Sequence, residues 1–524
     1  MSLFSAGEAG FADAISRLIY ANPFLPERIE AERDALAADF VREGAEWNLQ
    51  PGAAEASPVA AAPQPNLALI RRRVEALVER LSVAWPVADG PAGTRPPAAS
   101  DGERFSDLVL FSVFHRHCAR FDETIAGAEA TAAFRAPYYR EFVAEVERLL
   151  RRPGVPLLDE CPPEALFAFF FQVRRAFVHI HRSLVGASRP MARLRAAVWQ
   201  SIFTHDMRRY RRCLFSRMGE ITTLVTGESG TGKELVARAL ALSRHLPFDV
   251  RRGVFVGHPE QLFFPLNIAA LSPTLIESEL FGHRRGAFTG ALADRAGWLE
   301  VCPAAGTVFL DEVGEVDAAI QVKLLRVLQS RTFQRLGESE PRRFAGRIVA
   351  ATNRDLAAEI RAGRFREDFF FRLCGDQIAA PSLREQLADA PADLALVVGV
   401  VARRLVGEAE APVVASEVLV WIERELGAGY AWPGNFRELE QCVRNVLLRR
   451  EYHPRTAGPG RGAAPDWETI FATGSWTAEQ LLAHYCRSVF ARTQNIEETA
   501  RRLDLDRRTV KAKLGTAAFS AGRT

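Results

Sequence analysis

The sequence predicts a multidomain protein with an all-α N-terminal region, an α/β core and a C-terminal helix-turn-helix. Its 524 residues exceed what one hydrophobic core usually holds, so two to four domains are expected. Before about residue 186 the apolar residues recur at helical spacing, and after it strand-like runs alternate with helical ones. Alternation of this kind predicts a parallel sheet covered on both faces.

The composition is that of a soluble globular protein, with 48% hydrophobic and 25% charged residues. A net charge of +3 is small, so any contact with nucleic acid must come from a local basic patch. Seven cysteines stand singly without a C-x-x-C pair, which favours reduced thiols over disulfides or a zinc site. No signal peptide pattern is present, and the apolar run near residues 394–402 is too short to span a bilayer. We expect a cytoplasmic protein without a membrane partner.

Residues 1–185 are predicted to be a helical regulatory or interaction domain whose input the sequence does not reveal. His115, His117 and Cys118 lie close together, but 115 and 117 point to different faces of a helix, so a core or solvated role is favoured over a metal site. The run Leu166–Phe171 is apolar enough for a buried helix. Helices are expected at 11–19, 28–40, 67–83, 105–121, 138–150 and 163–184, with Ala/Pro-rich linkers at Pro51–Pro63 and Pro86–Ser100.

A phosphate-binding loop is predicted where the strand 221–226 meets the helix 234–242. Glycines let such a loop turn its backbone N–H groups inward, and the helix N-terminus adds partial positive charge for an anion. Lys233 would reach the β- and γ-phosphates. Glu234 stands where Ser or Thr usually binds magnesium, so the metal must depend on another carboxylate. The loop residues are Gly227, Glu228, Ser229, Gly230, Thr231, Gly232, Lys233 and Glu234.

A second strand, 307–311, ends in two carboxylates. The carboxyl end of a buried strand is where an α/β sheet usually carries its chemistry. Asp311 is expected to hold magnesium, and Glu312 to orient and polarise the attacking water. The strand 347–352 also ends on polar residues, and either Thr352 or Asn353 would hydrogen-bond the γ-phosphate or the water.

Three arginines downstream are candidates to stabilise charge on a transferring phosphoryl group. Arg366 and Arg372 lie six residues apart on one helical segment, where surface salt bridges are the alternative interpretation. Arg437 lies in the first turn of a helix for which Asn435 is the predicted N-cap, and it would reach a nucleotide.

The segment Gly286–Ala291 has glycines flanking an aromatic and a hydroxyl residue, which predicts an exposed turn. An ordinary glycine-rich turn is the alternative.

The tail predicts three helices, at 478–493, 496–503 and 506–514, the last capped by Asp506. Their lengths match a helix-turn-helix that binds double-stranded DNA. A solvated basic helix is the alternative. The residues expected to contact DNA are Arg507, Arg508, Thr509, Lys511 and Lys513.

Together these motifs resemble the sigma-54-dependent transcriptional activators, the bacterial enhancer-binding proteins, over about residues 186–450, with a Fis-like helix-turn-helix following. The resemblance implies an AAA+ ATPase with a small helical lid, which forms a ring, typically a hexamer, and uses ATP and Mg²⁺ to remodel the sigma-54 RNA polymerase holoenzyme. It is carried by the segments 227–234, 277–283, 286–291, 309–312, 365–368 and 432–435. The expected domains are a regulatory domain (1–185), the ATPase α/β subdomain (186–380), the lid (381–452), a linker (453–475) and the DNA-binding domain (476–524).

The resemblance also implies roles for single residues. Asn267 looks like the residue that switches Glu312 between active and resting poses, Asn353 like sensor I and Arg437 like sensor II. Arg366 and Arg372 resemble the fingers that reach a neighbouring subunit's ATP. The loop that touches sigma-54 would consist of Gly286, Ala287, Phe288, Thr289, Gly290 and Ala291, with Phe288 and Thr289 at its tip.

The sequence departs from the family pattern in four places. The segments 249–264 and 206–218 look like insertions, phenylalanines fill 369–371, and Asp504 stands where glycine is common. Two other functions compete with the activator: an AAA+ remodeller of another protein target, and a P-loop enzyme that phosphorylates a small molecule. Residues 286–291 argue against the first, and the acids and arginines against the second.

Overall fold

A computed structural model describes residues 3–42, 65–86, 97–131, 133–454, 476–493 and 495–514. The predicted linker Pro51–Pro63, most of the linker Pro86–Ser100 and residues 455–475 lie outside the described residues. The chain divides into two compact units, residues 1–451 and 452–524.

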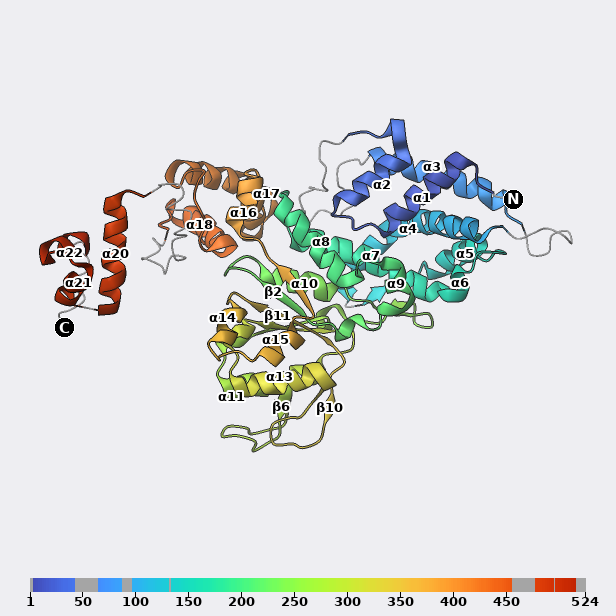
Figure 1. The fold of residues 1–524 in the computed structure, drawn as a ribbon. Coiled ribbons are helices and arrows are strands. Elements are labelled where there is room, and N and C mark those ends of the chain that lie inside the picture. Colours follow the sequence, from blue (N-terminus) through green and yellow to red (C-terminus); the bar gives the residue numbers. More distant parts are fainter. Residues whose placement is uncertain are drawn as a thin grey trace. The chain divides into compact units, whose positions relative to one another are not determined.

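The first unit begins with the predicted helical region, drawn in blue to cyan in Figure 1. Ser5 and Glu8 form a capping box that fixes the start of the first helix. The run Leu166–Phe171 is fully buried within α7, as expected. The helices are α1 (Ala6–Tyr20), α2 (Pro26–Leu36), α3 (Pro65–Ala84), α4 (Ala99–Thr131), α5 (Tyr139–Leu150), α6 (Leu157–Glu160), α7 (Pro163–Ser183), α8 (Arg189–Phe203) and α9 (Met207–Arg209).

A five-stranded parallel sheet in the order β12-β2-β11-β8-β5 forms the centre of the α/β core, which confirms the predicted fold class. Because all five strands run the same way, their carboxyl ends meet at one edge. Their bounds are β2 (Thr223–Thr226), β5 (Phe263–Asn267), β8 (Thr307–Asp311), β11 (Arg347–Thr352) and β12 (Asp376–Ala379).

Alternate residues of the inner strands enter two different hydrophobic cores, as the two-residue period of a strand requires. Phe309 and Val349 join the first core, with α10, whereas Leu310 and Ile348 join the second, with α13 and α15. The sheet is therefore buried on both faces. The helices are α10 (Lys233–Leu242), α11 (Pro273–Phe281), α12 (Trp298–Val301), α13 (Ala318–Ser330), α14 (Leu356–Arg361) and α15 (Glu367–Leu373).

The first core continues without interruption from the N-terminal helices into the sheet. A two-residue strand of the helical region, β1 (Phe134–Arg135), pairs with β4 (Val254–Phe255), which itself pairs with β3 (Phe248–Asp249). Phe171 of α7 stacks on Phe255 with ring centroids 3.8 Å apart. We call this contact region the aromatic joint. The segment 249–264, a departure from the family pattern, thus supplies one half of the joint.

The segment 206–218 also faces the N-terminal helices. Tyr210 is buried, and its hydroxyl donates a 2.9 Å hydrogen bond to the side-chain oxygen of Gln172 in α7. Both unusual segments of the α/β core therefore contact the N-terminal region.

A small helical bundle follows the sheet, as the predicted lid requires. The longest helix is interrupted at Gly407, whose φ of 79° is not helical. The helices are α16 (Leu383–Asp389), α17 (Asp393–Glu425) and α18 (Asn435–Arg449). Smaller elements of the first unit are β6 (Gly282–His283), β7 (Arg295–Ala296), β9 (Thr332–Phe333), β10 (Arg342–Arg343), a π-helical turn at Tyr210–Leu214 and 3₁₀ turns at Ala37–Asp39, Met218–Glu220, Pro259–Gln261, Ile268–Ala270 and Val313–Glu315.

The second unit contains α20 (Ala478–Thr493), α21 (Ile496–Leu503) and α22 (Arg507–Leu514) around a small core that includes Ala500 and Val510.

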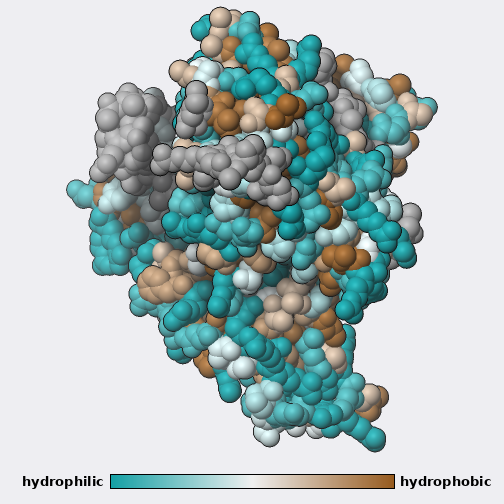
Figure 2. Space-filling model, turned by 90° about the vertical axis from the view of Figure 1, so that its right-hand side faces the viewer, coloured by the Kyte–Doolittle hydropathy of each residue, from teal (hydrophilic) through white to brown (hydrophobic). Residues whose placement is uncertain are grey.

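Hydrophilic residues dominate the face of the molecule shown in Figure 2, and the hydrophobic ones on it form small separate patches. Across the described part of the chain, no helix combines the length and apolarity needed to cross a membrane.

Candidate functional site

The predicted phosphate loop connects β2 to α10. Gly230 and Gly232 adopt left-handed backbone conformations, with φ of 80° and 85°, which other residues rarely tolerate. The Lys233 ammonium is buried and donates hydrogen bonds to the carbonyls of Gly227 and Glu228, both at 3.1 Å. Burial lowers the pKa of Lys233, while the nearby carboxylates of Glu312 and Asp311 act in the opposite direction. A lysine, a helix N-terminus and glycine-loop amides form a set suited to phosphates.

The two predicted acids lie at the carboxyl edge of the sheet, within electrostatic range of Lys233. Burial raises the pKa of Asp311, and Lys233 partly opposes this. Glu312 adopts a left-handed conformation with φ of 55°, and its carboxylate accepts a 3.3 Å hydrogen bond from the backbone N–H of Asn353. Asn267 is exposed and lies opposite Asp311 in the β5–β8 register. The structure thus brings together Lys233, Asp311, Glu312, Asn353 and Asn267.

Asp311 is a suitable magnesium ligand. It would not act within a larger set of protein ligands, because the described residues contain no group of three or more His, Cys, Asp or Glu side chains that could hold a metal ion. A single carboxylate fits this metal, because Mg²⁺ usually keeps several waters and binds through one or two carboxylates and substrate phosphates. Glu234 is exposed in the first turn of α10.

The lid touches the phosphate loop through polar contacts, which we call the polar joint. Arg437 donates a 2.9 Å hydrogen bond to the Ser229 hydroxyl, and the backbone N–H of Phe436 donates to the Gly230 carbonyl at 3.0 Å. A Cβ at Gly230 would lie 2.4 Å from the Gly434 carbonyl oxygen, so glycine is required for this approach. The structure therefore brings Arg437 to the phosphate loop.

The prediction that Asn435 is the N-cap of α18 is wrong. Gly434 occupies the cap, and Asn435 is the first helical residue, with a left-handed φ of 51°. Its buried side chain donates to Glu228 and to the Ser229 carbonyl, both at 3.1 Å, and accepts from the Leu383 N–H at 2.8 Å. The Asn435 side chain therefore links the lid to the phosphate loop and does not cap its own helix. Only the W-P-G-N motif pointed to this residue in the sequence.

Arg366 and Arg372 lie on or beside α15, away from this cluster. No hydrogen bond or ion pair among the described residues links either one to residues 227–234. Arg366 forms a two-pronged ion pair with Asp368, at 3.0 and 2.7 Å, which raises the pKa of the arginine. Arg372 is exposed next to Phe371, which is 67% exposed.

The segment Gly286–Ala291 lies in the loop between β6 and β7, the hairpin at the lower end of the α/β core in Figure 1. The Gly286 N–H donates to the Ala291 carbonyl at 2.9 Å, which closes the base of the turn. Thr289 is exposed, whereas Phe288 packs edge-on against His283 with centroids 5.0 Å apart. His283 is buried and hydrogen-bonded through Nδ1 to the Ser278 hydroxyl at 2.8 Å. The sequence carries no local signal for this supporting role of His283.

The three helices of the second unit have the expected lengths. Asp504 takes the left-handed conformation at the turn, with φ of 51°, and Asp506 caps α22 by accepting a 2.7 Å hydrogen bond from the Arg508 N–H. The five side chains predicted to contact DNA are exposed or half-buried on α22. Two of them form ion pairs, Arg507 with Glu497 at 2.8 Å and Lys513 with Glu479 at 2.7 Å.

Comparisons with known proteins identify part of the chain. Residues 203–379 match the sigma-54 interaction domain family. The Nif-specific regulatory protein of Azotobacter vinelandii is 44% identical over 233 residues, which are 44% of this chain and 40% of the relative. The transcriptional regulatory protein ZraR of Escherichia coli is 40% identical over 302 residues, 56% of this chain and 63% of the relative. The chain therefore spans about half the length of these relatives.

Among solved structures, that of NtrX from Brucella abortus in complex with ATP is similar at 26% identity. The match covers 63% of this chain and 68% of that one, with a TM-score of 0.37, so the likeness is loose.

Proposed function

Because residues 203–379 match the sigma-54 interaction domain family, we propose that the chain is an ATP-hydrolysing transcription activator that remodels the sigma-54 RNA polymerase holoenzyme. The observation that carries the proposal is the loop 286–291, with Thr289 exposed, on a hairpin of the same core that carries the phosphate loop. A cycle of ATP binding and hydrolysis at the phosphate loop would drive movement of the loop 286–291 against the polymerase.

ATP and Mg²⁺ are the proposed cofactors. Magnesium, when bound, supplies charge neutralisation on the phosphates. The loop amides of 227–234 and Lys233 would hold the phosphates, and Asp311 would hold the metal. Glu312 would orient the attacking water, with Asn267 modulating its pose. Asn353 and Arg437 are proposed to respond to the γ-phosphate, which their positions beside Glu312 and Ser229 support.

A homo-oligomeric ring, expected to be a hexamer, is proposed because no hydrogen bond or ion pair in the described part of the chain joins the arginines on or beside α15 to the phosphate loop of the same chain. Arg366 and Arg372 would complete a neighbouring subunit's site. To do so, Arg366 would have to leave its ion pair with Asp368 and bind the phosphate instead. Arg372 is exposed, and no carboxylate among the described residues lies within ion-pair distance of it. Hydrolysis that rises with protein concentration would support assembly.

Double-stranded DNA upstream of the promoter is the proposed ligand of the second unit. The basic, exposed surface of α22 supports phosphate and base contacts by Arg507, Arg508, Thr509, Lys511 and Lys513.

The test is ATP-dependent open-complex formation on a sigma-54 promoter, with the full chain, Thr289→Ala and the control Thr274→Ala. Thr274 is exposed on α11 of the same core but lies outside the loop. We expect all three to hydrolyse ATP and only Thr289→Ala to lose promoter opening. The full chain is needed because the N-terminal region shares a core with the ATPase.

Two outcomes would overturn the proposal. If all three proteins hydrolyse ATP and none opens DNA, the chain is a remodeller of another protein. If Thr289→Ala opens DNA as well as the control, the loop is not the effector.

A further inference from the structure

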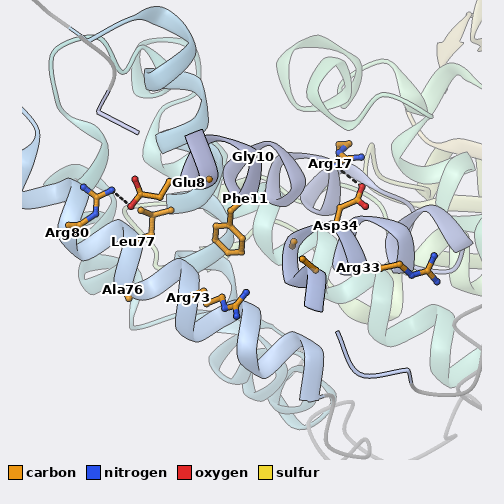
Figure 3. Close-up of a pocket in the computed structure, with 13 residues that line it drawn as sticks. Glu8, Gly10, Phe11, Arg17, Arg33, Asp34, Arg73, Ala76, Leu77 and Arg80 are labelled. Carbon is orange, nitrogen blue, oxygen red and sulfur yellow. Dashed lines mark hydrogen bonds and ion pairs between the residues drawn. The ribbon is translucent and has the colours of Figure 1, made fainter. Parts of the chain in front are cut away.

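A groove of about 1040 Å³ lies between α1, α2 and α3 in the N-terminal region, far from the phosphate loop in sequence (Figure 3). Its volume matches that of pockets that hold small organic ligands. Phe11 from α1 and Arg73 from α3 both point into the space between these helices (Figure 3). Nothing in the proposed function uses this groove.

The groove is kept open at a cost to local stability. Gly7 and Gly10 both line it from α1, and a Cβ added to either would meet no atom within 4 Å. Packing among the described residues therefore does not require glycine there, although glycine inside a helix, as at Gly10, costs about 1 kcal/mol relative to alanine. Ala37, another lining residue, has a positive φ of 50°, which is strained for alanine.

The lining is cationic around an apolar floor. Four arginines and two carboxylates line the groove, which leaves a formal charge of +2. The two carboxylates are already engaged: Glu8 with Arg80 at 2.6 Å, and Asp34 with Arg17 at 2.9 Å. Arg73 is half-buried and pairs with Asp39, which is exposed and does not line the groove. An incoming anion beside Phe11 would therefore share the Arg73 guanidinium with Asp39 or displace that carboxylate, whereas the fourth arginine, Arg33, lies over the Phe40 ring.

We propose that this groove binds a small organic anion with an apolar or aromatic body. The acid group would pair with the Arg73 guanidinium, whose planar fork suits a carboxylate, sulfonate or phosphate. The apolar body would lie against Phe11 and Leu77, where the missing side chains of Gly7 and Gly10 leave room.

The test uses anilinonaphthalene sulfonate, a fluorescent anion with an aromatic body, and its uncharged relative phenylnaphthylamine. Both are titrated into the full chain and into Gly10→Leu, Arg73→Gln and Gly127→Leu. Gly127→Leu is the matched control, because Gly127 is exposed on α4 with equally open space at its Cβ and does not line the groove. Probe bound elsewhere contributes equally to all proteins and cancels in the comparison.

We expect Gly10→Leu to weaken the binding of both probes to the groove by about tenfold or more, since the leucine side chain fills the space that the apolar body would occupy. Arg73→Gln should weaken the binding of the sulfonate by about five- to thirtyfold, because its charge-assisted hydrogen bond is lost. The binding of the uncharged probe should not change, since the Arg73–Asp39 ion pair that is lost at the same time is largely exposed. Leucine forms helices better than glycine, so the first variant is expected to fold.

The proposal fails if Gly10→Leu and Arg73→Gln bind both probes as the control does. It also fails if Gly10→Leu changes the sedimentation of the protein without changing probe binding, since the groove would then be a protein contact. Neither result bears on promoter opening, so this test is independent of the proposed function.

Discussion

The α/β core contacts its neighbours through joints of opposite character, and the lid's buried Asp393 adds a further polar contact by accepting hydrogen bonds from the Ala187 and Ser188 N–H groups. The aromatic joint with the N-terminal helices is a continuous hydrophobic core in which Phe171 and Phe255 stack at 3.8 Å and β1 pairs with β4. The polar joint with the lid consists of hydrogen bonds from Asn435, Phe436 and Arg437 to the phosphate loop.

This difference indicates which neighbour can move. Separating the aromatic joint would expose many apolar side chains to water, at a cost that grows with the area uncovered. Hydrogen bonds at a partly exposed contact exchange with water at small net cost. We therefore infer that the N-terminal region moves together with the sheet, while the lid opens and closes over the phosphate loop.

The largest expected effect is at the aromatic joint. Phe171→Ala should lower the free energy of unfolding by about 3–5 kcal/mol, because it removes a fully buried ring and leaves a cavity. Chemical denaturation followed by circular dichroism and by residual ATPase activity measures this. The two signals should be lost together, since helices and sheet share one core.

Phe371→Ala is the matched control, because this ring is 67% exposed and its loss should change stability by less than about 0.5 kcal/mol. Two separate unfolding transitions, with Phe171→Ala shifting only one of them, would show that the joint does not couple the two regions.

The next largest effect should be a loss of stability of the N-terminal helical region at acidic pH. His181 is buried against Phe24 and Phe177, and burial, with a contribution from Arg195, lowers its pKa to about 3. Between that value and the ordinary 6.5, the unfolded chain binds a proton that the folded chain does not, so stability falls as pH falls below about 6.5. Each pH unit costs about 1.4 kcal/mol, or roughly 2–3 kcal/mol at about pH 4.5.

His181→Phe keeps the ring and removes the titration, so its stability should depend less on pH across this window. Denaturation curves at several pH values, with the exposed His205→Gln as control, measure the difference. Parallel curves for wild type and His181→Phe would contradict the assignment.

The aromatic joint also marks the limit of what the sequence predicts. The phosphate loop and the acids of β8 were predictable because each depends on neighbours within a few residues and on the strand that precedes it. The burial of Leu166–Phe171 followed from its apolarity, but its partner Phe255 lies more than eighty residues away and carries no signal that pairs the two. The unusual segment 249–264 was visible as a departure, and only its position in space explains it.

At the polar joint, Asn435→Ala should cost about 1–3 kcal/mol, because it leaves the buried Leu383 N–H without its acceptor. Asn435→Gly loses the same hydrogen bonds but relieves the left-handed backbone, so it should be less damaging by about 1 kcal/mol. Thermal unfolding and hydrogen exchange of residues 227–233 measure the loss of stability in each variant. Equal losses in the two variants would mean that the backbone conformation is not strained.

The smallest effect should separate the two roles available to Arg437. Its hydrogen bond to Ser229 is exposed, so Ser229→Ala should change stability by less than about 1 kcal/mol. If Arg437 only holds the lid, Arg437→Gln should match Ser229→Ala, and the double variant should be no worse than either, because both remove one shared contact. If Arg437 instead turns to the nucleotide, as its proposed sensor role requires, Arg437→Gln alone should raise the KM for ATP. Steady-state ATPase kinetics on the three variants decide between these outcomes, and an unchanged KM in Arg437→Gln would leave this arginine as a residue of the joint only.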